Sequence, residues 1–391
     1  MPFTPPDSMD LLTALSVPAS QPRPTRVDVD LDAIEHNYNA LQARSGVPVM
    51  AVLKANAYGH GIGVVAKHLA ARGVSHFGVA YLEEALLIRA LGITTPTLVF
   101  GGVVTEQIPD FLKHDIQLAA SSVEKLEHIN REASTLGVRA KVHLKIDTGM
   151  ERIGTHYYSC GPLFDAAARC SDCDVVGIYS HLANADASNL AHAKLQVSRF
   201  EDCVSAATDR LGRQPTRHLA NSAAILALDS AHYDLVRSGQ ALYGALPAAH
   251  LAGRVELKPA MQWQSKVVYF KVVKPGHPVS YGSTWVSDTN TRVVTVPVGY
   301  ADGYPRSLSN RGEVVIRGKR YPVIGRVCMD QIMIDIGDGE AWNGDTVTLV
   351  GDDMPVSEVA RNADTIAHDI LSSISARVPR FYHRSGTPVS P

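Results

Sequence analysis

The chain has 391 residues, with 37 lysine and arginine residues against 39 aspartate and glutamate residues. This balance, without a long run of either sign, argues against a nucleic-acid or membrane surface and favours a small molecule or a second copy of the chain as partner. Five cysteines, an odd number, suit a reducing cytoplasm better than a disulfide framework. No segment reaches the roughly 20 apolar residues of a membrane span, so we expect a cytoplasmic protein.

The domain organisation is expected to be two domains between two tails. Residues 1–24 are rich in proline and lack the basic start and continuous apolar core of a secretory signal, which predicts a disordered tail. We assign 25–256 to a first domain, 257–384 to a second and 385–391 to a short terminal tail. Cys170 and Cys173 form a CxxC pair without a second pair or a nearby histidine, so no metal site is expected.

The first domain alternates short apolar strands with amphipathic helical segments, which is typical of parallel sheets with crossover helices. Eight such units at near-regular spacing predict an α/β fold of the (β/α)8-barrel type. A doubly wound sheet is the alternative, but Gly59, Gly61 and Gly63 give GxGxG rather than the dinucleotide-binding GxGxxG. The predicted strands are 48–54, 76–80, 97–101, 116–119, 140–146, 174–180, 216–220 and 233–237, with helices that include 64–72, 122–136 and 190–211.

From about Leu257 the helical periodicity fades, and β-rich runs appear between glycine and proline turns. This change predicts a mainly β C-terminal domain, closed by one helix over about 356–371. The runs are MQWQSKVVYFKVV, TRVVTVPVGY, GEVVIRG, KRYPVIGRV, QIMIDI and DTVTLVG.

Lys54 ends the first apolar strand, PVMAVLK, directly before a turn. A cation at the end of so apolar a segment must meet a partner or lose its proton, unless its side chain extends into water. A neutral amine is what a Schiff-base lysine needs in order to attack a carbonyl group.

Further polar residues follow other predicted strands, at the face where such barrels place their active sites. Each has a structural alternative: His181 as a core histidine, Arg237 as a rim ion-pair partner, Ser222 as a helix cap. Their accumulation at one face favours a phosphate-bearing cofactor attached through Lys54. The residues are Tyr58, Arg152, His181, Asn221, Ser222, Arg237, Gly239 and Gln240.

The blocks that carry these residues resemble, in the same order, those of the bacterial alanine racemases, which are pyridoxal-phosphate enzymes. The resemblance extends over about 26–382, and it implies that Lys54 binds the cofactor and shares proton exchange with a second base, Tyr281, supplied by the other subunit of a homodimer. The blocks are AVLKANAYGHG, HLKIDTGMERIG, HLANSAA, DLVRSGQALYG, VSYGSTW, VGYADGYPR, GRVCMDQIMIDI and ARVPR.

The resemblance assigns further roles. Arg237, supported by His181, would face the ring nitrogen of pyridoxal 5'-phosphate, while Arg152 and the backbone of Met329 would bind the substrate carboxylate. Lys145 matches a lysine that is carbamylated in some members of the family. The phosphate would be held by Tyr58, Ser222, Gly239 and Gln240, and Asn221 would also bind the cofactor. The entrance or its support would be formed by Tyr300, Cys328, Asp330 and Ala376.

Ala376 is a departure, because many alanine racemases have a tyrosine before RVPR. The resemblance implies a racemase that interconverts L-alanine and D-alanine, serving cell-wall synthesis or D-alanine catabolism. Ala376 leaves open a broad or serine-preferring racemase on the same fold. An amino-acid decarboxylase is disfavoured by Tyr281 and the RVCMDQ block. The alternative of another class is a non-catalytic pyridoxal-phosphate carrier.

Overall fold

The computed structural model describes residues 23–389, which form two compact units. The first unit is Leu31–Lys258, and the second joins residues 23–30 to residues 259–389. The strands of the first unit are β2 (Val49–Val52), β3 (His76–Val79), β4 (Thr97–Val99), β5 (Leu118–Ala120), β6 (Ala140–Asp147), β7 (Thr155–His156), β8 (Cys173–Tyr179), β9 (Thr216–His218) and β10 (Val236–Ser238).

The parallel strands of this unit close into a barrel. Strands β10, β2, β3 and β4 form one run, and β5, β6, β8 and β9 form another. The runs are joined by the amide of Gln117, which donates to the Thr97 carbonyl at 2.9 Å, and by the amide of Arg237, which donates to the Ala220 carbonyl at 2.9 Å. The predicted (β/α)8 barrel is confirmed, and the carboxyl ends of its strands share one face.

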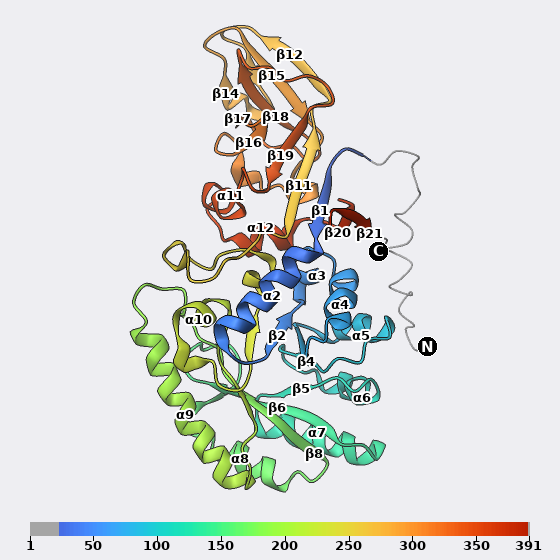
Figure 1. Cartoon of the computed structure of the whole chain (residues 1–391), viewed down its shortest axis with the longest axis vertical. Coiled ribbons are helices and arrows are strands. Elements are labelled where there is room, and N and C mark those ends of the chain that lie inside the picture. Colours follow the sequence, from blue (N-terminus) through green and yellow to red (C-terminus); the bar gives the residue numbers. More distant parts are fainter. Residues whose placement is uncertain (1–22, 390–391) are drawn as a thin grey trace. The chain divides into compact units, whose positions relative to one another are not determined.

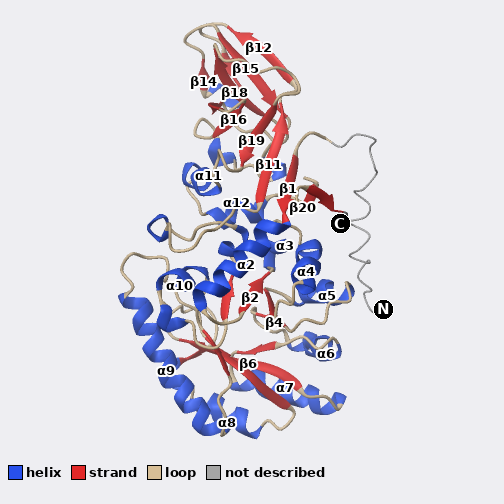
Figure 2. Cartoon of the chain, in the orientation of Figure 1, coloured by secondary structure: helices blue, strands red, loops and turns tan. Residues whose placement is uncertain are grey.

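Helices cover the outside of the barrel (Figures 1 and 2), and its interior contains an apolar cluster beside buried polar side chains. The interior cluster contains Met50, Leu98, Ala119, Tyr179 and Leu235, all nearly inaccessible to solvent. No helix within the described range is long and apolar enough to cross a bilayer. The helices are α2 (Leu31–Ser45), α3 (Lys54–Tyr58), α4 (Ile62–Ala71), α5 (Leu82–Ala90), α6 (Ile108–Lys113), α7 (Val123–Leu136), α8 (Gly161–Arg169), α9 (Ala191–Leu211) and α10 (Ser222–Ala227).

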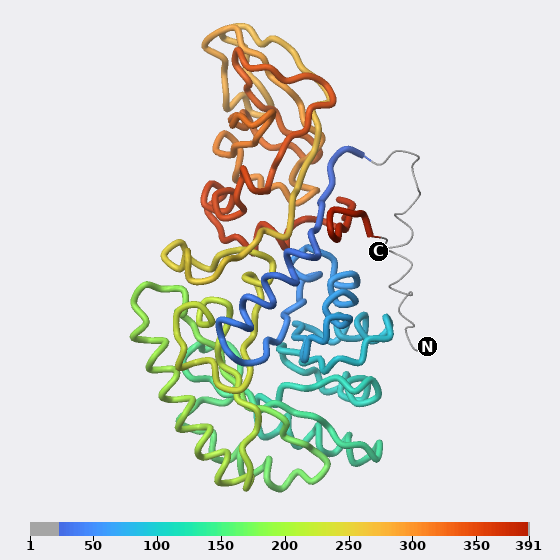
Figure 3. Tube along the Cα trace, viewed as in Figure 1, coloured from blue at the N-terminus to red at the C-terminus, as the bar shows by residue number. Residues whose placement is uncertain are grey.

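The second unit is built on a largely antiparallel sheet of ten strands, in the order β12-β15-β18-β17-β16-β19-β11-β1-β20-β21. Strand β1, near the start of the chain, lies beside β20, near its end, and Figure 3 shows these two segments together. On its other side β1 pairs with β11. The elements are β1 (Arg26–Asp30), β11 (Met261–Lys266), β12 (Tyr269–Val273), β13 (Pro278–Val279), β14 (Trp285–Val286), β15 (Thr291–Val296), β16 (Glu313–Ile316), β17 (Lys319–Ile324), β18 (Ile332–Gly337), β19 (Thr346–Val350), α11 (Val356–Asn362), α12 (Ala367–Ser373), β20 (Arg380–Arg384) and β21 (Thr387–Val389).

Three features of the second unit differ from the sequence-based expectation. Residues 26–30 belong to this unit rather than to the barrel, because β1 pairs with β11 and β20. The expected terminal tail contains β21, which forms a hairpin with β20. The single expected helix is two helices, separated near Asp364, whose φ of 59° ends the first. Most of the predicted N-terminal tail lies outside the described residues.

Asn37 of α2 connects the beginning and the end of the barrel unit. Its side chain is fully buried, and its amide group donates to the Leu242 carbonyl at 3.1 Å and to the Lys258 carbonyl at 2.8 Å. Its side-chain oxygen accepts from the amide of Lys258 at 2.7 Å. One side chain thus pairs with three backbone groups, and its bond to the Leu242 carbonyl is buried.

We predict that Asn37→Ala lowers the free energy of unfolding by about 2 to 4 kcal/mol, because three hydrogen bonds are lost and the buried Leu242 carbonyl loses its side-chain partner. Urea denaturation of the variant and the parent chain measures the difference. The matched control is Gln42→Ala, at an exposed position on the same helix, which should change the free energy by less than about 0.5 kcal/mol. Equal effects of the two substitutions would contradict the prediction.

Candidate active site

Lys54 lies at the carboxyl end of β2, directly after the fully buried Leu53, and its own side chain is half-buried. Burial lowers the pKa of Lys54, and the positive charge of Arg152 lowers it further, while the carboxylate of Glu84 acts in the opposite direction. A larger fraction of this amine is therefore neutral than for a lysine in water, as a nucleophile requires.

Arg237 is buried, and backbone carbonyls at the ends of β8 and β9 accept hydrogen bonds from its guanidinium. One terminal nitrogen donates to the His218 carbonyl at 2.6 Å, and the other donates to the carbonyls of Ser180 at 2.8 Å and Leu219 at 3.0 Å. The second nitrogen also lies 3.4 Å from Nδ1 of His181. Burial lowers the pKa of Arg237 to about 10, which still leaves the guanidinium charged at neutral pH. The strand prediction is corrected here, because Arg237 lies within β10 rather than at its end.

A chain of hydrogen bonds continues from Arg237 through the barrel. Arg237 lies 3.2 Å from Nδ1 of His218, Nε2 of His218 lies 2.9 Å from Nδ1 of His143, and Nε2 of His143 lies 2.9 Å from Oε1 of Gln117. A guanidinium only donates, so Nδ1 of His218 accepts and both imidazoles carry their proton on Nε2. The protons of the chain therefore all point away from Arg237.

These two histidines are neutral at physiological pH. Burial lowers the pKa of His143 to about 3, with the charges of His76 and Arg237 adding to the effect. Burial also lowers the pKa of His218 well below its usual value, helped by His143 and Arg237. Gly177 makes room for this arrangement, since a Cβ at that position would lie 2.2 Å from Nδ1 of His143.

Ser222, Gly239 and Tyr58 meet at the ends of β9 and β10. The hydroxyl of Ser222 accepts from the amides of Gly239 at 3.0 Å and Ala241 at 3.3 Å. A Cβ at Gly239 would lie 2.3 Å from the phenolic oxygen of Tyr58, so only glycine allows the two segments to approach so closely. The cap of α10 is Asn221, which accepts from the amide of Ala224 at 3.0 Å, so the alternative role of Ser222 as that cap does not hold.

Asp147, at the end of β6, shapes the loop that carries Arg152. Its carboxylate accepts from the amides of Gly149 at 2.8 Å, Met150 at 2.9 Å and Arg152 at 3.1 Å. Burial would raise the pKa of Asp147, but these backbone donors outweigh it and the pKa is lowered. Asp147 is therefore an anion that orders the loop.

Lys145 of β6 is buried, with its amine 4.7 Å from the centre of the Tyr179 ring. Burial lowers its pKa to about 7, as does the charge of Arg237, and Asp147 partly opposes these effects. His181 is affected by the same surroundings, because burial and the charges of Arg237, Lys145, Arg152 and Lys54 all lower its pKa.

At the strand ends, the positive charges of Lys54, Lys145, Arg152 and Arg237 all act on His181, and Arg237 lies 3.4 Å from its Nδ1. The carboxylates that act on these lysines, Glu84 and Asp147, are fewer than the cationic groups. Such an excess of donors and positive charge suits anionic ligand groups, such as a phosphate and a carboxylate. The predicted barrel residues therefore lie together at one face.

The predicted residues of the second unit also form one group. The hydroxyl of Ser280 donates to the Arg326 carbonyl at 2.7 Å and lies 3.6 Å from the sulfur of Cys328, which places the Tyr281 turn beside the segment that contains Cys328. The amide of Tyr300 donates to the Cys328 carbonyl at 3.0 Å. Large side chains here face solvent within the single chain: Tyr281 is 72% exposed, Met329 52% and Tyr300 42%.

Ala376 is exposed and precedes Arg377, whose guanidinium contacts both Asp330 and the buried Asp302 at 2.6 Å. These ion pairs tie the Ala376 segment to the segment that carries Asp330. Both carboxylates raise the pKa of Arg377, so the arginine stays charged.

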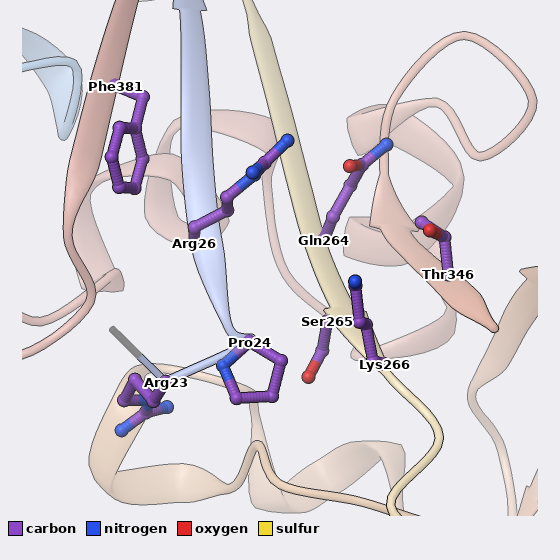
Figure 4. A pocket seen from close by; sticks show the side chains of 8 residues that line it. All are labelled: Arg23, Pro24, Arg26, Gln264, Ser265, Lys266, Thr346 and Phe381. Carbon is purple, nitrogen blue, oxygen red and sulfur yellow. The ribbon is translucent and has the colours of Figure 1, made fainter. Parts of the chain in front are cut away.

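A separate hollow of about 440 Å³ lies in the second unit, between β1, β11, β19 and β20 (Figure 4). It contains none of the residues that the sequence singled out. Arg23 pairs with Asp302 at 2.7 Å, and Arg26 pairs with Asp28 at 2.9 Å, so its arginines already have carboxylate partners. We therefore place the candidate site at the barrel face and not in this hollow.

Sequence reasoning missed several residues that organise the barrel site. Asp147 had a visible signal, since it ends a predicted strand in KIDTG. The other missed residues make contacts between positions that are distant in sequence, and no local sequence pattern predicts such contacts. These residues are Glu84, Gln117, His143 and His218.

The fold and the site define a (β/α)8-barrel enzyme with lysine and arginine side chains at its strand ends and a β-rich second domain. Family models describe residues 29–247 as the alanine racemase N-terminal domain and 260–382 as the C-terminal domain. The chain belongs to the alanine racemase family of isomerases.

Individual relatives agree with this assignment. The alanine racemase of Symbiobacterium thermophilum is 43% identical over 366 residues, which is 92% of this chain and 97% of the relative. The alanine racemase structure from Streptomyces lavendulae has a TM-score of 0.90 at 36% identity, covering 93% of this chain and 98% of that one. The Bartonella henselae enzyme, solved with covalently bound pyridoxal phosphate, has a TM-score of 0.86 at 29% identity, covering 93% of this chain and 100% of that one.

The buried neutral histidines predict that stability declines in mild acid. Their pKa values are lowered in the folded chain, so below about pH 6.5 the unfolded chain binds more protons and stability falls by about 1.4 kcal/mol per pH unit for each such histidine. His143→Gln retains a donor and an acceptor but cannot titrate. Between pH 6.5 and 5, the free energy of unfolding of this variant should fall less steeply with decreasing pH than that of the parent, by the contribution of one histidine. Urea unfolding at several pH values measures the slope. An unchanged slope would contradict the assignment of His143 as a buried neutral histidine.

Proposed function

We propose that the chain is a pyridoxal-phosphate-dependent racemase that interconverts L-alanine and D-alanine with two bases, Lys54 and Tyr281. The observation that carries the proposal is the excess of cationic groups around a lysine whose pKa is lowered by burial. A cofactor phosphate and a substrate carboxylate would supply the negative charge that these groups lack.

The side chains present fit this cofactor. The hydroxyl groups of Tyr58 and Ser222 both lie against the backbone at Gly239, where they would donate to a phosphate group. Asn221, Gln240 and His181 lie at the same strand ends and complete the proposed binding set. Bound pyridoxal phosphate supplies an electron sink for the pair of electrons left on the substrate α-carbon. The covalent cofactor of the Bartonella henselae relative supports the assignment.

Arg237 would face the ring nitrogen as a donor only. Three backbone carbonyls hold its guanidinium, and its pKa of about 10 keeps it charged. A charged arginine does not readily hand over a proton, so the ring would be a weaker electron sink than one paired with a carboxylic acid. Proton return to the α-carbon would then compete well against side reactions.

The two bases would act on opposite faces of the α-carbon, since one base cannot easily serve both. Lys54 has the lowered pKa that a base near neutral pH needs. Tyr281 is 72% exposed within the single chain, so its hydroxyl is accessible to a second copy. We propose a homodimer in which Tyr281 of one subunit completes the site of the other.

The substrate carboxylate would be bound by Arg152, which the Asp147 loop positions, and by the backbone of Met329. Cys328, Tyr300, Asp330 and Ala376 would form the entrance. Lys145 is proposed to be carbamylated, because a buried amine with a pKa of about 7 is partly neutral and can react with carbon dioxide. The resulting anion would offset the charge of Arg152.

One observation favours a broader racemase as the second candidate. Ala376 is small and exposed, and it occupies the position before RVPR at which many alanine racemases have a tyrosine. Relaxed selection of side-chain size changes binding by only about 1 to 3 kcal/mol per methylene and leaves the mechanism intact. A pure cofactor carrier would have no use for the exposed Tyr281 on a second unit.

We propose a cytoplasmic enzyme, since all five cysteines are free thiols and such thiols persist in reducing compartments. D-alanine formed there would serve cell-wall synthesis, and the reverse reaction would serve D-alanine breakdown.

We predict that purified chain supplied with pyridoxal phosphate converts L-alanine into D-alanine until the enantiomers are equal. Chiral chromatography of each reaction measures the product, and a panel that includes L-serine and larger amino acids tests the width of the site. Absence of D-alanine would refute the proposed reaction. Serine turnover equal to alanine turnover would replace it with the broader racemase.

We predict that Tyr281→Phe lowers racemisation by about a hundredfold or more, because one of the two bases is removed. The visible absorbance of bound cofactor should persist, since Lys54 is untouched. The matched control is Tyr269→Phe, an equally conservative change at an exposed tyrosine of the same unit, which should leave the rate unchanged. Full activity of Tyr281→Phe in both directions would contradict the two-base assignment.

A further inference from the structure

The segment after Lys54 is wound in the left-handed sense. Ala55, Asn56 and Ala57 have φ and ψ values of 53° and 52°, 55° and 46°, and 54° and 51°, and Tyr58 follows with φ of 51°. Left-handed backbone is unfavourable for residues with a Cβ, and four such residues in succession are rare. Such a conformation persists only where surrounding contacts enforce it.

Glu84, in the first turn of α5, provides one of these contacts. Its Oε1 accepts from the amide of Ala55 at 2.6 Å, and its Oε2 accepts from the amides of Ala80 at 2.8 Å and Tyr81 at 3.3 Å. The amide that directly follows Lys54 is therefore bound to the segment that follows β3. One carboxylate joins the ends of two neighbouring barrel strands.

Helix capping alone explains only half of this geometry. Glu84 is the third residue of α5, where a carboxylate commonly accepts from the amide preceding the helix, here that of Tyr81. Oε2 suffices for that purpose. Oε1 is directed instead at the turn of Lys54, and Asn56 secures the far end of the same turn by accepting from the amide of Ile62 at 2.8 Å.

The charge of Glu84 acts on the same lysine. The groups that influence Lys54 come from different elements: Arg152 from the loop after β6 and Glu84 from α5, with His181 from the loop after β8 also near enough to be affected by the lysine. Arg152 disfavours the ammonium form of Lys54, and Glu84 favours it. The carboxylate therefore limits how far burial and Arg152 can deprotonate the amine.

We propose that Glu84 is a positioning residue for Lys54, which holds the lysine's left-handed turn with one oxygen and balances the charge of Arg152 with its negative charge. The inference rests on the proposed function in so far as Lys54 is the reactive amine. Nothing in the sequence pattern links the two positions, because their contact crosses from one βα unit to the next.

The test measures the reactivity of Lys54 directly, on the full-length chain freed of cofactor. Acetic anhydride at trace levels labels neutral amines, and mass spectrometry of the Lys54 peptide gives the labelling rate against pH, with the exposed Lys67 as internal reference. In Glu84→Gln the reactivity profile should move to lower pH, with labelling at pH 7 faster by roughly twofold or more. Glu83→Gln, an exposed neighbour with the same change of charge, should leave the profile in place.

Glu84→Asp separates the two parts of the proposal and covers the case in which Glu84→Gln fails to fold. It keeps the charge but shortens the side chain, so exchange of the backbone amides over 54–58 should quicken by about tenfold while the Lys54 profile stays near that of the parent. An unmoved profile in Glu84→Gln, or a shift to higher pH as the amine becomes solvated, would overturn the charge role. Unchanged amide exchange in Glu84→Asp would overturn the positioning role.

These measurements require no racemisation. If the chain failed to racemise alanine while the Lys54 profile moved as expected, the proposed function would fall and the role of Glu84 would stand. If the chain racemised alanine while the Lys54 profile stayed unmoved in Glu84→Gln, the proposed function would stand and the charge role of Glu84 would fall.

Discussion

The burial of Arg237 is the constraint on which the rest of the barrel site depends. A guanidinium taken out of water needs acceptors for its donors, and here the carbonyls at the ends of β8 and β9 provide them at 2.6 to 3.0 Å. Because these carbonyls belong to neighbouring strands, the arginine can be satisfied only when the barrel is closed. Its charge is then fixed at the strand ends, where it lowers the pKa values of the neighbouring His143, His218, Lys145 and His181.

The surrounding chemistry follows from that fixed cation. Arg237 can only donate, so the protons of His218 and His143 point away from it toward Gln117, and both rings stay neutral. The same charge lowers the pKa values of Lys145 and His181. The site therefore carries mainly neutral or cationic donors, which the protein's own hydrogen bonds hold in place, and this is the arrangement that electrostatic preorganisation requires.

At Lys54, an unfavourable backbone conformation and a nearby carboxylate occur together. The amine proposed to react lies between a buried strand and a left-handed turn, and a carboxylate from α5 contacts that turn. The second unit has a comparable feature, since Tyr281 follows Ser280, whose φ is 67°, in a turn with two further positive φ values. Both proposed bases thus lie in backbone that surrounding contacts must enforce, as is common at functional sites.

The sequence by itself determined the barrel, the β-rich second domain and the strand ends that carry Lys54, His181 and Ser222, because hydrophobic periodicity and residue type are local properties. Tertiary structure alone decided that β1 joins the second unit, that α11 and α12 are separate, and that Glu84, His143 and His218 organise the site. The physical reason is that strand partners and hydrogen bonds between distant positions depend on the closed fold. No local pattern of side chains can specify them.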